Sequence, residues 1–481
     1  MADILLTADR SIMNNFHLKG RIAFPFYGSG EMFPSWLFRV LIGKPKHEKG
    51  VAKYAPYPLR KIEASLIDAG FNVLTVSPEH LEKYINNAKI LGIHTVDPLG
   101  LGSKPYFYES IKDREHHSVT YFKKLIQQPC INKAKKNGLK IVIGGEGAWQ
   151  LRKIPYSHLS KFVDYIVIGE GEKIVQQLFR DIIDEKTIPK YLSAEKSPTI
   201  DEISTIKNAS NFGCIEIGRG CNRHCKFCEV TKANLRWYPY EKIEKELIIN
   251  NEQGIKKGII HAEDVLLYGE KGFIPNNEKI IKLFKLVYKH YNEFIITHFS
   301  LAALYANKKL FKNIMEIVSE HQNFFMGEAG IETASGRLMK ETMSGKVLPF
   351  KIEEWEEIIK GSLVLMHDNN FIPYCSLIIG LPGEKEEDVI KTLNLVDDLK
   401  DLRFILLPSG FTPLGTYSDL DFEKSSIETL DPLRQELVKK CNTHNARWIY
   451  DIAKIILDKN VEYRFLSKIW YIQAYLKNML T

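Results

Sequence analysis

The sequence predicts an α/β protein in three parts: an N-terminal Rossmann-like domain, a partial (β/α)6 barrel and a C-terminal helical segment. Short β-branched runs alternate with stretches of helical period over the first 180 residues and again over residues 213–417. This alternation is typical of parallel strands covered by helices. The length of 481 residues also fits about three structural units of roughly 150 residues each.

The N-terminal domain is predicted over residues 1–190, with strands at 4–7, 73–76, 90–94, 141–143 and 165–168. A helix is predicted over residues 59–69, because its apolar residues share one face and Gly70 ends it. In such a sheet a ligand lies at the carboxyl ends of the strands. The small or polar residues there are Thr7, Asp9, His94, Thr95, Gly144, Gly145, Glu146, Gly169, Glu170 and Gly171.

A polar stretch with two prolines, residues 186–206, predicts a linker before the second series of strands. The barrel is predicted over residues 205–430, with strands at 214–217, 258–261, 294–298, 324–329, 374–379 and 403–407. Helices such as 241–252 and 385–399 alternate with these strands, which is the pattern of a (β/α) barrel. Residues 431–481 predict two helices without strands, expected to cap the mouth of the barrel.

Composition excludes several classes of protein. Hydrophobic residues make up 44% and charged residues 26%, which excludes bulk disorder, collagen and coiled coils. The net charge of +7 is spread without a long basic block and is no argument for an anionic partner. No apolar run reaches the ~18 residues of a membrane span, and no signal peptide is visible, so we expect a cytoplasmic protein without a membrane partner.

The seven cysteines are too few and too scattered for a disulfide framework, which indicates a reducing compartment. Three of them, Cys221, Cys225 and Cys228, lie within eight residues on one glycine-flanked loop. A tetrahedral zinc site usually closes with four ligands, whereas three thiolates leave one metal position open. An iron-sulfur cluster with one open iron is the leading interpretation. Zinc, with His224 as a fourth ligand, and three unligated core cysteines are the alternatives.

The CxxxCxxC spacing, with Phe227 before the third cysteine, resembles the signature of radical S-adenosylmethionine enzymes. The resemblance implies that Cys221, Cys225 and Cys228 hold a 4Fe-4S cluster whose open iron binds S-adenosylmethionine. It also implies reductive cleavage to a 5′-deoxyadenosyl radical, which requires an electron donor such as ferredoxin or flavodoxin.

Three further elements follow in the order that this family has. Residues 330–335 (GIETAS) resemble its "GIES" element, residues 378–384 (IIGLPGE) its "IGLPGE" turn, and residues 411–416 (FTPLGT) its "PxPGT" turn. The family's usual "GGE" is replaced by His-Ala-Glu-Asp at 261–264. The resemblance implies contacts to S-adenosylmethionine from Phe227, Glu263, Ser300, Glu332 and Leu381. Alternatives are an exposed acidic pair for Glu263 and a helix-capping carboxylate for Glu332.

The N-terminal sheet resembles the cobalamin-binding domain that precedes the barrel in one branch of this superfamily. The resemblance rests on IVIGGE at 141–146 and DYIVIGEGE at 164–172. It implies that the ten edge residues named above contact cobalamin. No Asp-x-His-x-x-Gly motif occurs, so no protein histidine is expected as the lower ligand of cobalt. Alternatives are a sheet that has lost the cofactor and a core role for His94.

The branch implies a cobalamin-dependent methyltransferase that methylates an unactivated sp3 carbon of a protein, peptide or small molecule. A residue of methyl-coenzyme M reductase in an archaeal source is one example of such a post-translational modification. The main alternative is a radical enzyme of rearrangement, cyclisation or oxidation, with cobalamin absent or not the methyl donor. A zinc-stabilised binding protein for RNA is a third class. No nucleic acid is expected, because no stripe of Arg and Lys with aromatics is present.

Overall fold

The computed structural model describes residues 2–14, 38, 44–103, 105–106, 115–153, 158–421 and 426–457. The chain forms two compact units, each assembled from separate stretches of sequence. The first contains Met1–Gly102, Ile111–Ile215 and Glu241–Lys256. The second contains Ser103–Ser110, Glu216–Tyr240 and Lys257–Thr481.

A six-stranded sheet in the order β4-β1-β5-β6-β7-β8 forms the centre of the first unit, and its strands pair in parallel. The strands are β1 (Ile4–Ala8), β4 (Val73–Thr75), β5 (Ile90–His94), β6 (Lys140–Gly144), β7 (Tyr165–Ile168) and β8 (Tyr191–Ser193). The register places Ala8 beside His94 and His94 beside Gly144. The carboxyl ends of the central strands therefore lie at one edge.

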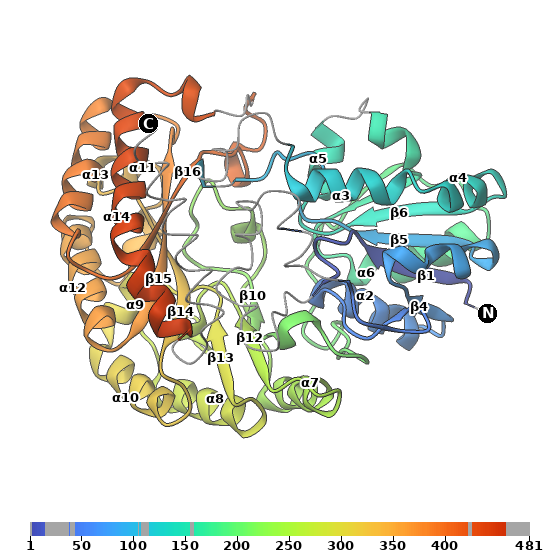
Figure 1. Ribbon diagram of the computed structural model, residues 1–481, viewed down its shortest axis with the longest axis horizontal. Helices are drawn as coiled ribbons and strands as arrows, with labels where there is room; N and C mark the ends of the chain where they lie inside the picture. Colours follow the sequence, from blue (N-terminus) through green and yellow to red (C-terminus); the bar gives the residue numbers. More distant parts are fainter. Residues whose placement is uncertain are drawn as a thin grey trace. The chain divides into compact units, whose positions relative to one another are not determined.

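Helices cover both faces of this sheet (Figure 1). Strand residues with alternating orientation pack against α2 (Tyr57–Asp68) and α6 (Glu172–Ile183) on one face. On the other face they pack against α3 (His117–Ile126), α4 (Pro129–Lys136) and α5 (Ala148–Lys153). Because a strand buried on both faces needs apolar residues at successive positions, the runs ILLTA and KIVIG read as continuous hydrophobic stretches. A short hairpin joins β2 (His47–Glu48) to β3 (Val51–Ala52).

Buried charges of α2 hold other segments of the first unit in place. Lys61 and Glu246 form an ion pair whose side chains are at most 1% exposed. Glu246 lies on α7 (Tyr240–Glu252) and also accepts from the Tyr57 hydroxyl group at 2.7 Å. Arg60 donates to Glu63 and to the carbonyl oxygen of Ala209. α7 and the segment before β9 (Cys214–Glu216) are thereby tied to α2.

The second unit is a curved series of parallel strands. β12 (Lys257–His261) pairs with β13 (Glu293–Ile296), and β14 (Phe325–Glu332) pairs with β15 (Phe371–Ile379), which pairs with β16 (Ile405–Gly410). An isolated bridge between His298 and Glu328 links the two groups of strands. β9, paired with β12, lies at the other side of the series. This arrangement is a partial barrel.

Helices form the outer layer of this unit in Figure 1. They are α8 (Asn277–His290), α9 (Leu301–Ala306), α10 (Lys308–Ser319), α11 (Gly336–Thr342), α12 (Trp355–Asp368) and α13 (Glu386–Asp398). Rings of Phe284 and Phe311 on the helices meet Phe294, Phe325 and Phe371 on the strands. Since side chains alternate along a strand, Met326, Glu328 and Tyr374 lie on the opposite, inner face.

The structure corrects two expectations about the chain between and after the sheets. Part of the expected linker is a strand, because β8 adds to the first sheet beside β7. The C-terminal helix α14 (Pro432–Leu457) packs on α13 and β16, and Ile449 and Ile452 contact residues near the start of β14 to β16. It is therefore not a cap over the carboxyl ends of the strands. The second expected C-terminal helix falls in residues 458–481, outside the described part of the chain.

The other predicted strands are present, with bounds that differ by no more than a few residues. The largest differences are at β14, which ends at Glu332 instead of Ala329, at β15, which begins at Phe371 instead of Tyr374, and at β16, which lies two to three residues later than expected. No helix within the described residues has the length and apolar character needed to cross a membrane.

The buried pair of Lys61 and Glu246 generates a first prediction. Glu246→Gln leaves the Lys61 ammonium buried without a carboxylate, so we expect the free energy of unfolding to fall by about 3 kcal/mol. Equilibrium unfolding in urea, followed by circular dichroism, measures the change. The double variant Lys61→Met, Glu246→Leu should recover at least half of the loss. Glu293→Gln, which breaks the exposed pair with Lys257, is the control and should cost less than about 1 kcal/mol. An equal loss in both single variants would contradict the argument.

Candidate functional site

The cysteine loop begins after β10 (Gly218–Arg219), which pairs antiparallel with β11 (Arg236–Trp237). Gly220 has a φ of 84°, and a Cβ atom there would lie 2.5 Å from the carbonyl oxygen of Asn234. Only glycine fits this close approach of two backbone segments. Cys225 is buried, Cys221 and Cys228 are half-buried, and all three are free thiols.

Arg223, between the first two cysteines, anchors the loop. Its guanidinium group is buried and donates to the carbonyl oxygens of Gly345, Lys346 and Leu348 at 3.2, 2.8 and 3.0 Å. It also donates to Ser300 Oγ at 2.6 Å and forms an ion pair with Asp264 at 3.3 Å. One side chain thus joins the loop to the segments that follow β12, β13 and β14.

Backbone contacts hold the rest of the loop. The Lys226 amide donates to the carbonyl oxygen of Thr342 at 2.8 Å, and its own carbonyl accepts from the Thr416 amide at 2.8 Å. A Cβ atom at Gly415 would lie 2.4 Å from the Lys226 carbonyl oxygen, and one at Gly345 would lie 2.0 Å from that of Arg223. The predicted turn at 411–416 therefore packs directly against the cysteine loop.

The thiols lie in a setting that disfavours their ionisation when no metal is bound. Burial raises the pKa of Cys221 and of Cys228 to about 11, and the carboxylate of Glu263 adds to both shifts. Burial also raises the pKa of Cys225. Because iron binds the thiolate form, loading of this loop with iron would release protons.

The donor set fits an iron-sulfur cluster. Three thiols share one anchored loop, while His224, the alternative fourth ligand for zinc, is exposed with a left-handed φ of 52°. Within the described residues no three His, Cys, Asp or Glu side chains are placed to hold a single metal ion. In a 4Fe-4S cluster each cysteine binds a different iron atom, so its ligands do not converge on one point.

Glu332 lies beside this loop, at a bulge near the end of β14. Its φ is 62°, and its two carboxylate oxygens accept from Lys346 Nζ and Ser376 Oγ, each at 3.0 Å. The helix cap of α11 is Ser335, which accepts from the Leu338 amide, so the capping alternative for Glu332 is wrong. Burial opposes the charge on Lys346, but Glu332 and Cys225 outweigh it and raise its pKa.

The other residues predicted to contact S-adenosylmethionine differ in how exposed they are and in which partners they have. Glu263 is half-buried after β12, near Cys221 and Cys228, and Phe227 is half-buried within the loop. Ser300 is the N-cap of α9 and binds Arg223 and Asp264, so its hydroxyl group has a structural role. Leu381 is 2% exposed and packs in the core at the end of β15.

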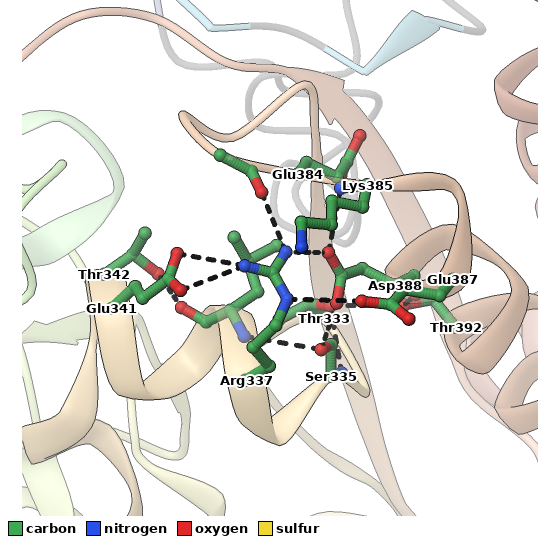
Figure 2. A network of polar contacts seen from close by, with 12 residues as sticks. Thr333, Ser335, Arg337, Glu341, Thr342, Glu384, Lys385, Glu387, Asp388 and Thr392 are labelled. Atoms are coloured by element: carbon green, nitrogen blue, oxygen red, sulfur yellow. Dashed lines mark hydrogen bonds and ion pairs between the residues drawn. The ribbon is translucent and has the colours of Figure 1, made fainter.

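A polar network joins two of the motifs that the sequence analysis identified, residues 330–335 and 378–384 with the helix that follows (Figure 2). Asp388 is 1% exposed, accepts from Ser335 and Arg337, and caps α13 by accepting from the Lys385 amide at 2.8 Å. Burial opposes ionisation of Asp388, but the hydrogen bonds from Arg337 and Ser335 outweigh it and lower its pKa. The network fixes the loop after β14 against the loop after β15.

In the first unit, the structure brings the ten predicted edge residues to the carboxyl ends of β1, β5, β6 and β7. Several of them are occupied by local contacts. Thr7 donates to the carbonyl oxygen of Val76 at 2.8 Å, and Asp9 accepts from the Ser11 amide at 2.8 Å. A Cβ atom at Gly145 would lie 2.5 Å from His94 Nδ1, so this glycine is needed for packing on His94.

Other groups at this edge are suited to a ligand. Thr95 Oγ1 and Asn14 Nδ2 are buried atoms without a hydrogen-bond partner among the described residues, and such atoms are rare unless a ligand or water satisfies them. His94 is buried, burial lowers its pKa, and the exposed Glu146 lies 3.7 Å from its Nε2 atom. Gly144, Gly169, Glu170 and Gly171 lie at the ends of β6 and β7.

The sequence analysis missed Arg223, Lys346 and Asn14. Arg223 lies inside the cysteine motif, so its position was a usable signal. Lys346 and Asn14 lie in segments without a pattern that indicates a site.

The anchor role of Arg223 generates a second prediction. Arg223→Met removes its donated hydrogen bonds and leaves Asp264 buried without a cation, so the loop should open more often. We expect Cys225 in the metal-free protein to react with a thiol reagent at least about tenfold faster, measured by mass spectrometry of the labelled peptide. Lys226→Met, which changes an exposed side chain of the same loop, should leave the rate within about twofold. Equal rates in the two variants would contradict the anchor role.

The network around Asp388 generates a third prediction. Asp388→Asn replaces charge-assisted hydrogen bonds by neutral ones and should lower the free energy of unfolding by about 2 kcal/mol at pH 7. Since the pKa of Asp388 is lowered on folding, the difference from wild type should shrink as the pH falls below about 4. Glu386→Gln, at an exposed position in the first turn of the same helix, is the control and should change stability little. A constant difference down to pH 2 would contradict the role of the charge.

Comparison with known proteins agrees with this geometry. Residues 215–396 match the profile of the Radical SAM superfamily. A tRNA-2-methylthio-N(6)-dimethylallyladenosine synthase of Thermodesulfovibrio yellowstonii is 25% identical over 300 residues, 59% of this chain and 62% of that protein. A ribosomal protein uS12 methylthiotransferase RimO of Petrotoga mobilis is 23% identical over 52% of this chain and 53% of that protein. The chain therefore spans less than two thirds of the length of these two relatives.

Among solved structures, the radical S-adenosylmethionine methyltransferase TsrM from Kitasatospora setae has a similar fold. The structure with tryptophan and a S-adenosylmethionine analogue has a TM-score of 0.53 and 14% identity, over 86% of this chain and 75% of TsrM. A second structure of TsrM, with cobalamin and a [4Fe-4S] cluster, has a TM-score of 0.51 over 85% of this chain and 72% of TsrM. Residues 215–396 thus form a Radical SAM domain, and the fold of the chain is similar to that of TsrM.

Proposed function

We propose that the protein is a cobalamin-dependent methyltransferase that methylates an unactivated sp3 carbon of a protein or peptide. The observation that carries the proposal is that one chain has both an anchored three-cysteine loop and a parallel sheet with buried polar atoms at its carboxyl edge. Among the described residues these atoms have no hydrogen-bond partner. The similar fold of TsrM, solved with both cobalamin and a [4Fe-4S] cluster, supports this pairing.

In the second unit, Cys221, Cys225 and Cys228 would hold the cluster, and Arg223 would keep their loop in place. A bound cluster and S-adenosylmethionine supply a 5′-deoxyadenosyl radical, which can remove hydrogen from a carbon that ordinary bases cannot deprotonate. Glu263 would accept hydrogen bonds from the ammonium group of S-adenosylmethionine. Lys346 neutralises Glu332, so the two together add no net charge beside the cluster.

In the first unit, the edge residues would hold the corrinoid. Asn14 and Thr95 offer polar atoms to its amide side chains, and Gly144, Gly169 and Gly171 let a large planar ligand approach the backbone. His94 packs against Gly145, and we propose that no histidine of the chain binds cobalt from below. We propose residues 1–190 as the corrinoid domain, 205–430 as the domain for the cluster and S-adenosylmethionine, and 431–481 as a helical segment.

Transfer of methyl rather than methylthio groups is supported by the placement of the other cysteines. Insertion of sulfur requires a sulfur source close to the substrate. Cys130, Cys214, Cys375 and Cys441 lie singly on α4, β9, β15 and α14. Cys375 and Cys441 are fully buried. These four thiols therefore do not form a second group beside the cluster loop.

The substrate is proposed to be a protein or peptide, with ferredoxin or flavodoxin as electron donor. The expectation that no nucleic acid binds has no support, because one curated relative is named for a tRNA product and another for a ribosomal protein. A tRNA is therefore the second candidate substrate. The radical enzyme without cobalamin as methyl donor remains the alternative activity.

A fourth prediction tests the proposed function. Protein purified without oxygen and supplied with hydroxocobalamin should show a corrinoid spectrum with about one cobalt per chain and should cleave S-adenosylmethionine to 5′-deoxyadenosine. With S-adenosylmethionine deuterated in its methyl group, a protein or peptide of the source organism should gain a deuterated methyl group on carbon, detected by mass spectrometry. RNA from the same cells, digested to nucleosides, is analysed in parallel.

Two variants make the outcomes distinct. Cys225→Ala should lose both its iron and the formation of 5′-deoxyadenosine. Cys130→Ala, which changes a thiol on α4, should keep both. Cobalt-free protein that still forms 5′-deoxyadenosine would establish the alternative activity. A labelled nucleoside would show that tRNA, and not a protein, is the substrate. Full iron content in Cys225→Ala would refute the cluster assignment.

A further inference from the structure

The inner face of the partial barrel carries a second polar group, separate from the cysteine loop. His298 and Glu328 lie next to each other where the isolated bridge joins the chain after β13 to β14. His298 Nε2 and Glu328 Oε2 are 3.8 Å apart. This separation is longer than a hydrogen bond, so neither atom satisfies the other.

Both side chains are accessible, although their backbones are part of the sheet. Their exposed fractions are 41% for His298 and 43% for Glu328. The other ring nitrogen of His298, Nδ1, is buried and has no hydrogen-bond partner in the part of the chain that the structure describes. The two side chains are therefore close enough for one ligand to contact both. They do not form a hydrogen bond with each other.

Neighbouring side chains hold this pair in position. The His261 ring lies 6.0 Å from the His298 ring at 74°, and its Nδ1 atom is 2.9 Å from Thr297 Oγ1. Tyr374 lies beside Glu328 in the register of β14 and β15, on the same inner face. Three strands thus contribute to one polar wall opposite the phenylalanine layer.

The charges favour a cationic ligand. Burial raises the pKa of the Glu328 carboxyl group, and His298 compensates only in part. A carboxylate in this situation gains more from a cation than from a neutral donor. The other inner carboxylate of β14, Glu332, already has Lys346 as its partner. The carboxylate oxygens of Glu328 are therefore available to accept hydrogen bonds from a ligand, whereas Glu332 is already paired.

We infer that His298 and Glu328 form a binding site for an ammonium or guanidinium group, which anchors a cationic side chain of the substrate within the barrel. The interpretation of this ligand as substrate rests on the proposed function, whereas the preference of the site for a cation does not. His298 and Glu328 are positioning residues in this inference. They would hold the substrate carbon near the cluster loop and would take no part in bond breaking.

The test uses small probes of equal chain length: n-butylammonium, n-butylguanidinium and neutral butyramide. Binding to the full chain is measured by saturation-transfer NMR, on the protein as purified and after reconstitution with iron, sulfide and S-adenosylmethionine. Both cations should bind at least about tenfold more tightly than butyramide, because a charge-assisted hydrogen bond replaces a neutral one. The preference should be the same in both preparations.

Variants show which side chains cause the preference for cations over butyramide. In Glu328→Gln the cations should bind no more than about twofold more tightly than butyramide. His298→Gln should weaken the binding of both cations. The matched controls are Glu316→Gln and His321→Gln, on exposed side chains outside the barrel, and neither should change the preference. Thermal unfolding of each variant shows whether it is folded. Glu263→Gln tests whether the probes bind at the other free inner carboxylate.

The outcomes separate this inference from the proposed function. The inference is wrong if wild type shows no preference for cations, if Glu328→Gln keeps it, or if Glu263→Gln alone removes it. If wild type binds no cobalt or forms no 5′-deoxyadenosine, then the proposed function fails while the probe measurements still decide the nature of this site.

Discussion

The geometry of the second unit depends on one buried guanidinium group. Arg223 belongs to the cysteine loop, yet its contacts are with Asp264, Ser300 and the backbone of residues 345–348. These partners follow three different strands, so the position of the loop is fixed only when all three are correctly placed. A thiol loop without such an anchor would be a flexible ligand set, and a cluster with one open iron needs its three thiolates held in a constant geometry. The glycines at 220, 345 and 415 serve the same end, because each removes a side chain from a close backbone approach.

The inner wall of the barrel shows a gradation of polarity that follows from this arrangement. Near the start of the strands, Met326, Ile372 and Ile405 pack against Ile449 and Ile452 of α14. Two to four residues further along β14 and β15 the wall becomes polar, with Glu328, Tyr374 and Ser376. At the carboxyl ends it reaches Glu332, Lys346 and the cysteine loop. An apolar floor therefore closes one end, while the polar groups lie toward the end where cluster chemistry is proposed. Asn445 supports this floor from the side, since its amide group both accepts from and donates to the backbone of Leu406 on the edge strand β16.

The charged groups buried in the molecule fall into two kinds. Lys61 with Glu246, and Arg337 with Asp388, are paired within the protein and connect segments distant in sequence, which is a structural use of charge. Glu263 and Glu328 lie on half-buried inner positions and carry no such strong partner among the described residues. Because these two carboxylates are half-buried and remain accessible, a cationic group of a ligand can pair with them. This contrast supports both the S-adenosylmethionine contact at Glu263 and the cation site at Glu328.

The sequence alone determined the α/β class, most strands and the cysteine loop, because hydrophobic periodicity and the spacing of cysteines are local properties of the chain. It also determined the neighbouring motifs, which have recognisable residues at fixed spacings. Only the tertiary structure decided what those residues do: Ser300 caps a helix and binds Arg223, Glu332 pairs with Lys346 instead of capping, and part of the expected linker is strand β8. It also placed α14 along the side of β16, where its first turn reaches Glu384 after β15, and joined His298 to Glu328 across a bridge. The side-chain contacts among these features join residues between 14 and 77 positions apart, and no local pattern encodes which distant partner a polar side chain will meet.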